Sequence, residues 1–89
     1  MSNKRDLKKS IQVICAELLT ECVAASLYGN KAHQEDAEAL FYSIVRMQHD
    51  FISRISHPEP GMPAKKYFRL LCEQFTAQAS ELVDQVNNL

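Results

Sequence analysis

The 89-residue sequence is poor in the residues that interrupt regular structure, with only two glycines and three prolines. Both residue types favour turns and loops, so their scarcity predicts long, uninterrupted secondary-structure elements. The length fits one domain that covers residues 1–89. A single core in so short a chain gives modest stability, and oligomerisation commonly compensates for it.

Long apolar runs are also missing. The longest run before Cys22 is the four residues 13–16, whereas a secretory signal needs roughly 7–15 apolar residues. No window offers the about 20 predominantly apolar residues of a membrane-spanning helix. The three cysteines are an odd number without disulfide spacing, which is typical of a reducing compartment. We therefore expect a cytoplasmic protein that does not associate with membranes.

Motifs for catalysis and cofactor binding are lacking too. The sequence has no Glu-x-x-His, which carboxylate-bridged di-iron bundles require. Gly29 and Gly61 are too far apart to form a glycine-rich phosphate loop. Ser56 and His57 are adjacent, but the sequence offers no identifiable third group that would orient them as a nucleophile and its base. We expect a non-catalytic protein without a cofactor.

The cysteines of the first segment raise the question of a metal site. Cys15 and Cys22 lie about 10.5 Å apart along a helix axis, too far for a disulfide or for one zinc ion. We interpret them as part of a packing face, in which free cysteine behaves as a small apolar residue. In an antiparallel bundle Cys15 and Cys72 lie at nearly the same level and His49 lies within about one turn of it, so we also consider a Cys/Cys/His cluster. It has no fourth ligand, so we expect no metal.

Apolar residues recur at steps of three and four in three segments, which predicts amphipathic helices. The stripe of the first segment consists of Leu7, Ile11, Ile14, Leu18, Cys22 and Ala25. That of the second consists of Leu40, Phe41, Ile44, Gln48, Phe51, Ile52 and Ile55. That of the third consists of Phe68, Leu71, Cys72, Phe75, Ala79, Leu82, Val83 and Val86.

Gly29 and the prolines set the boundaries of these helices. Gly29 suits the left-handed conformation at a helix end, Pro58 disfavours helix at His57, and Pro63 fits a first turn. We place the helices near residues 4–28, 32–56 and 63–87, and expect Glu35 and Asp36 in the first turn of the second. Short loops and matched lengths predict an all-α, up-down-up antiparallel three-helix bundle.

The first helix is more apolar than a one-sided helix requires. Of the 18 residues 11–28, 13 are apolar. A helix that is apolar nearly all round is usually buried nearly all round, and two neighbours cannot cover it. Scattered apolar surface residues are the alternative interpretation. We expect a homodimer, and name four residues as its interface: Val13, Leu19, Val23 and Leu27.

Charge is unevenly distributed although the formal net charge is only −1, which excludes a uniformly basic nucleic-acid binder. In an antiparallel bundle, residues 1–16 and 44–74 form one half, with nine cations and four anions, or +5. Residues 17–43 and 75–89 form the other half, with one cation and seven anions, or −6. The seven cations at the outer end of the basic half are Lys4, Arg5, Lys8, Lys9, Lys65, Lys66 and Arg69.

This polarity has three interpretations. The charges form a solvated surface, as charge runs usually do; or opposite ends attract in an antiparallel dimer; or the basic end binds nucleic acid or another anion. The last uses the start of the third helix, where backbone N–H groups favour phosphate, with Tyr67 or Phe68 as a stacking ring. We expect a protein–protein interaction or self-association module, with anion binding as the alternative.

Overall fold

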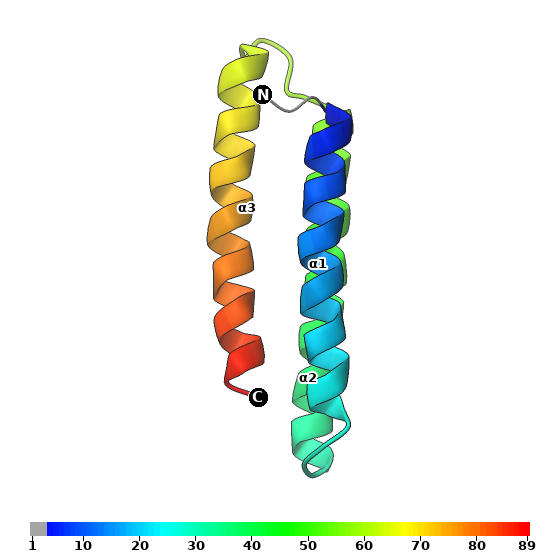
Figure 1. Cartoon of the computed structure of the whole chain (residues 1–89). Coiled ribbons are helices and arrows are strands. Elements are labelled where there is room, and N and C mark those ends of the chain that lie inside the picture. Colours follow the sequence, from blue (N-terminus) through cyan, green and yellow to red (C-terminus); the bar gives the residue numbers. More distant parts are fainter. Residues whose placement is uncertain (1–3) are drawn as a thin grey trace.

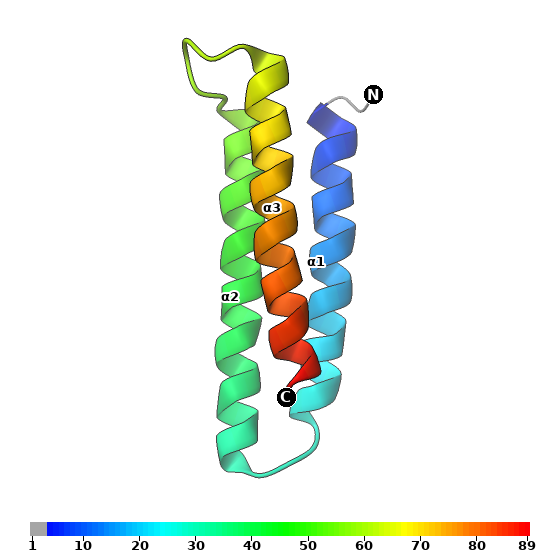
Figure 2. The ribbon, with the colours of Figure 1, turned by 90° about the vertical axis from the view of Figure 1, so that its left-hand side faces the viewer.

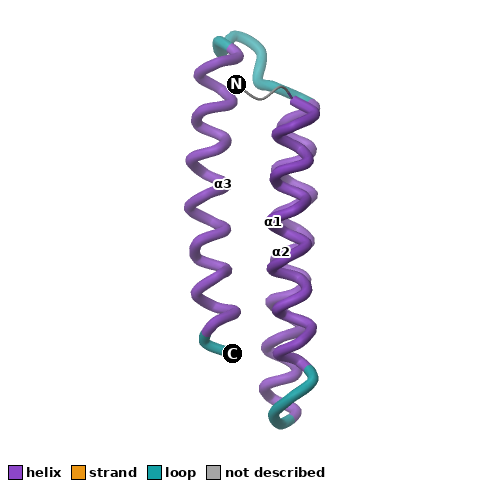
Figure 3. The backbone as a smooth tube through the Cα atoms, in the orientation of Figure 1, coloured by secondary structure: helices purple, strands orange, loops and turns teal. Residues whose placement is uncertain are grey.

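The computed structural model describes residues 4–89, which form three α-helices and no strand (Figure 3). Helix α1 spans Lys4–Ser26, α2 spans Lys31–Ser56 and α3 spans Ala64–Asn87. The predicted all-α class and the three helices are confirmed, and each predicted boundary lies within two residues of the observed one. The described part of the chain is elongated, with principal dimensions of 49 × 19 × 17 Å.

The turn between α1 and α2 is held by three short-range features. Gly29 has φ +90°, the left-handed conformation predicted for it. Asn30 caps α2, because its Oδ1 accepts a hydrogen bond from the backbone N–H of His33 at 2.9 Å. The His33 ring reaches back, and its Nε2 donates to the carbonyl of Ala25 at 2.9 Å. One side chain therefore ties the end of α1 to the start of α2.

This capping corrects one expectation about the start of α2. Since Asn30 is the cap, the first turn begins at Lys31 and contains no acidic residue. Glu35 and Asp36, expected in that turn, lie one turn further along the helix. The charge of the helix dipole falls off within the first turn. The amide cap, rather than carboxylates, therefore satisfies the start of α2.

The connection between α2 and α3 is proline-rich and ends at Pro63, which precedes α3 and provides no side-chain cap. Gly61 also has a left-handed conformation, with φ +86°. Tyr67 fastens α3 to the end of α2, since its hydroxyl donates to the carbonyl of Arg54 at 3.0 Å.

The helices alternate in direction, so that α1 and α3 run one way and α2 runs the other (Figure 1). Helices α1 and α2 share the most extensive interface, and α3 lies across the face that the two present jointly (Figure 2). The turn between α1 and α2 extends past the C-terminal end of α3 (Figure 1). One side of the α1–α2 pair is therefore covered, whereas the other side and the tip are not.

The core runs along the shared axis of the three helices. Phe51 and Phe75 pack edge to face, with ring centroids 5.3 Å apart. Burying each such side chain contributes roughly 1.5–3 kcal/mol. The buried residues are Ile11, Cys15, Leu18, Cys22, Ala37, Leu40, Ile44, Met47, Phe51, Ile55, Leu71, Phe75, Ala79 and Val86.

The predicted stripes were wrong at three positions. Ile14, Cys72 and Val83 are exposed, whereas Cys15 is fully buried. For Ile14 the reason is the rotation of α1 about its axis. The buried face of α1 consists of Ile11, Cys15, Leu18 and Cys22, so Ile14 lies at the edge of that face. Because α1 is apolar nearly all round, its sequence pattern fits more than one rotation.

Candidate interaction surface

The face of α1 turned away from the core is apolar and exposed. Val13 is 51% exposed, Val23 is 47% exposed, and Leu27, the residue after α1, is 70% exposed. The structure thus places three of the four predicted interface residues at the surface. The fourth, Leu19, is partly buried and packs against the core of its own chain, so its role in an interface stays a prediction.

These residues belong to a regular series on α1. The sequence from Lys9 to Leu27 has Lys9, Val13, Ala16, Thr20, Val23 and Leu27 at alternating steps of four and three. Residues with this spacing lie on one side of a helix. Ala16 and Thr20 are exposed, like the other members of this series. We call this series the outer face of α1.

Sequence reasoning missed Ala16 and Thr20 as members of this face. Threonine counts as polar in a hydropathy pattern, but here its Oγ1 donates to the carbonyl of Ala16 at 2.9 Å. The hydroxyl is already satisfied, so a partner that covered Thr20 would leave no unpaired donor. The sequence signal that identifies both residues is a second series with steps of four and three, which lies on the opposite side of α1 from the buried series.

A shallow hollow of about 550 Å³ adjoins the C-terminal end of the outer face, between α1 and α2. Val23 and Leu27 form its α1 side, and Glu38, Phe41 and Tyr42 lie on its α2 side. Tyr42 is 61% exposed, so an aromatic ring adds to the accessible apolar surface. The apolar surface therefore continues from α1 onto α2 at the tip that α3 does not reach.

The three thiols have two different environments. Cys15 and Cys22 are fully buried, as predicted for a packing face, and Cys22 Sγ donates to the carbonyl of Ala37 at 3.0 Å. Burial raises the pKa of both thiols, so they stay protonated and unreactive near neutral pH. Cys72 is exposed.

The structure separates the Cys15, Cys72 and His49 positions by environment, since His49 and Cys72 are exposed and Cys15 is buried. Within residues 4–89, no three His, Cys, Asp or Glu side chains are grouped closely enough to hold a metal ion. The geometry therefore offers no support for the Cys/Cys/His cluster.

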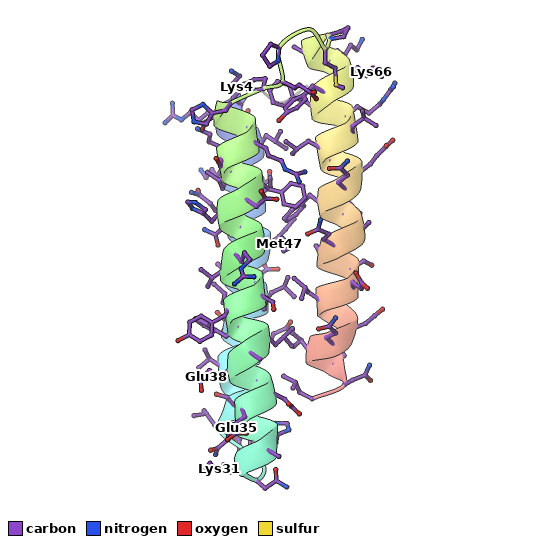
Figure 4. The ribbon with its side chains drawn as sticks, turned by 180° about the vertical axis from the view of Figure 1, so that it is seen from behind. Lys4, Lys31, Glu35, Glu38, Met47 and Lys66 are labelled. Atoms are coloured by element: carbon purple, nitrogen blue, oxygen red, sulfur yellow. The ribbon has the colours of Figure 1, made fainter. Side chains whose placement is uncertain are left out.

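The basic residues gather at one end of the bundle. Figure 4 shows Lys4 of α1 and Lys66 of α3 at this end, and Lys31, Glu35 and Glu38 of α2 at the other. Six of the seven predicted anion-binding cations are exposed and Lys8 is partly buried; the exposed ones are Lys4, Arg5, Lys9, Lys65, Lys66 and Arg69. The charge separation inferred from the sequence thus corresponds to the two ends of the structure.

The two rings suggested for base stacking are already engaged. Tyr67 is hydrogen-bonded to Arg54, and both Tyr67 and Phe68 are partly buried against the core. The Nζ of Lys4 lies 6.0 Å from the centroid of the Phe68 ring, within the range of a cation–π contact. The basic end therefore has cations but no free aromatic platform at these positions.

None of the three helices, judged over residues 4–89, carries an apolar stretch long enough to cross a bilayer. The chain matches no protein-family model, no curated protein and no solved structure. Its candidate site rests on the apolar outer face of α1 and on the separated charges.

Proposed function

We propose that this chain is a small, non-catalytic helical protein that works by self-association or by binding another protein through the outer face of α1. The observation that carries the proposal is the concentration of exposed apolar surface. Five of the eight large apolar side chains exposed in the described part of the chain fall within residues 13–28: Val13, Ile14, Val23, Leu27 and Tyr28. Exposed apolar residues gathered in one region are typical of an interaction surface.

A homodimer is the form we favour. The reducing compartment in which we place it, the cytoplasm, suits a protein whose two buried cysteines pack as unpaired thiols. Val23 and Leu27 are 47% and 70% exposed, so covering each removes apolar area from water and contributes about half to two thirds of the roughly 1.5–3 kcal/mol of full burial, before the entropic cost of binding.

Val23→Glu tests this function, because a charge at an apolar contact is poorly tolerated. Light scattering coupled to size exclusion should give a dimer mass for the unmodified chain and a monomer mass for the variant. Ala77→Glu is the matched control: Ala77 is exposed on α3 and lines none of the hollows that the outer-face residues line, so its dimer should persist. A Val23→Glu chain with unchanged mass and melting temperature contradicts the proposal.

Anion binding is the second candidate, favoured by the exposed cations at one end and by the start of α3, which no side chain caps. Such binding weakens steeply with salt because counterions are released. Lys65→Glu with Lys66→Glu should abolish binding to short DNA and RNA at low salt. If the unmodified chain binds neither nucleic acid at low salt, this candidate is removed.

A further inference from the structure

The outer face of α1 has a symmetry that bears on its partner. Val13 and Val23 are ten residues apart, which is about 15 Å along the helix. Ala16 and Thr20 lie between them, each at the same distance from the midpoint at residue 18. The order of side chains is therefore large, small, small, large in either direction. A two-fold interface has to be self-complementary, and a series that reads alike in both directions meets that condition.

We propose that the partner of this face is a second copy of the chain, with the two α1 helices antiparallel and the two-fold axis at the level of residue 18. This inference rests on the self-association proposed above. In this register Val13 lies opposite the partner's Val23, and Ala16 lies opposite the partner's Thr20. The small central side chains let the helices approach closely, and the valines close the contact on both sides.

The charges at the two ends of the face favour the same arrangement. Lys9 stands at one end of the outer face, and Leu27 stands at the other. Glu38 lines the same hollow as Leu27. In the antiparallel register Lys9 reaches the level of the partner's Leu27 and meets the partner's Glu38. The contact occurs twice by symmetry and joins the +5 half of one copy to the −6 half of the other.

A parallel pair has the opposite electrostatics. It places the basic ends of both copies together and the acidic ends together, so that like charges face each other. Such contacts are unfavourable and help to exclude wrong orientations. The unequal charge of the two ends therefore selects the antiparallel pair, while the apolar residues supply the contact itself.

One pair opposes association in the proposed register. Glu17 is exposed and lies beside the outer face, one residue from the level of the axis. The two-fold operation therefore brings it near the partner's Glu17. Glu17→Gln removes this repulsion, and the dissociation constant should fall by about threefold at low salt. A weaker dimer in this variant contradicts the register.

Disulfide trapping tests the orientation directly. Val13→Cys and Val23→Cys are made separately, each with Cys72→Ser to remove the exposed thiol. One variant is labelled with ¹⁵N, and equal amounts are mixed and oxidised. Mass spectrometry then separates the mixed disulfide from the two like-with-like disulfides. The antiparallel register predicts the mixed disulfide in at least tenfold excess over either of the others.

The remaining outcomes distinguish failure of the register from failure of the proposed self-association. A dimeric unmodified chain that yields mainly like-with-like disulfides, or the mixed disulfide in only the about twofold excess over each of the others that random pairing gives, overturns the antiparallel register and leaves self-association intact. An unmodified chain that is monomeric by light scattering and gives no disulfide overturns both. Circular dichroism of each variant shows whether its helices are retained.

Charge reversal gives a second, independent test. Lys9→Glu and Glu38→Lys should each weaken the dimer by about tenfold at low salt, because each places like charges together. The double variant Lys9→Glu with Glu38→Lys restores the pair with its signs exchanged, so its dissociation constant should return to within about threefold of the unmodified chain. Additive weakening in the double variant contradicts the contact.

Discussion

The two apolar faces of α1 differ in what covers them. The inner face, with Ile11, Cys15, Leu18 and Cys22, is buried against α2 and α3. The outer face includes Val13 and Val23, which have comparable side chains but are about half exposed. Periodicity therefore identifies both faces as apolar, and only the packing of the chain shows which of them the fold itself uses.

The largest expected effect on the free energy of unfolding comes from a substitution on the inner face. Leu18 is only 3% exposed, so Leu18→Ala leaves a cavity and should lower the free energy of unfolding by about 2–5 kcal/mol. Val23→Ala removes methyl groups from the surface and should change that free energy by less than about 0.5 kcal/mol in the monomer. Urea unfolding at a concentration that keeps the chain monomeric measures both. Similar losses in the two variants would contradict the distinction between the faces.

The turn that joins α1 to α2 gives the next effect, since it holds the inner face in place. Gly29→Ala forces an L-residue into φ +90°, and its Cβ would lie 2.8 Å from the His33 ring. We expect a loss of about 1–3 kcal/mol in the free energy of unfolding. Thermal and urea unfolding report it.

Gly61→Ala is the matched control for that variant. Gly61 has a similar φ of +86°, but a Cβ there has no heavy atom within 4 Å. It should cost about 1 kcal/mol, the backbone contribution alone. If the two variants lose equal stability, the His33 contact does not contribute to the turn.

The pH dependence of stability gives the smallest effect. Burial raises the pKa of Cys15 and Cys22 above the ordinary value of 9.0. Above that pH the unfolded thiols ionise while the folded ones keep their protons, so the folded state binds more protons. Stability should therefore be unaffected by these thiols below about pH 9 and fall above it, by at most about 1.4 kcal/mol per pH unit for each thiol.

Urea unfolding between pH 8 and pH 10 measures this slope. Cys15→Ala should show a shallower fall than the unmodified chain, because one of the two buried thiols is gone. Cys72→Ala should show the same fall as the unmodified chain, since Cys72 is exposed. A slope unchanged by Cys15→Ala would contradict the inference that its burial contributes to the pH dependence.

Most of the fold was predictable because local features determine it. Gly29 and the prolines around residues 58–63 fix the helix ends, and the four-three spacing fixes the helices. The rotation of α1 was less accessible, since Ile14 and Cys15 fit an apolar stripe equally well until neighbouring helices choose between them. The cap by Asn30 was missed because Asn30 directly follows the glycine that ends the first helix. The sequence alone does not show which of the next residues begins the second helix.

The candidate site was predictable in part for similar reasons. Val13, Val23 and Leu27 stood out as apolar residues away from the main stripe. Leu19 could not be separated from them by sequence, because its partial burial depends on how the core packs in three dimensions. Thr20 could not be included because its hydroxyl bond to the carbonyl of Ala16 is visible only in the structure.

Solution mass is the measurement that addresses self-association most directly. Light scattering coupled to size exclusion, on the unmodified chain at about 100 μM and at low and high salt, should give twice the chain mass of 10.1 kDa. The dimer should persist at high salt, since apolar contact supplies its affinity and charge mainly its orientation. A monomer at both salt concentrations would contradict self-association through the outer face of α1. A dimer only at low salt would show that the charged ends, rather than the apolar face, hold the two copies together.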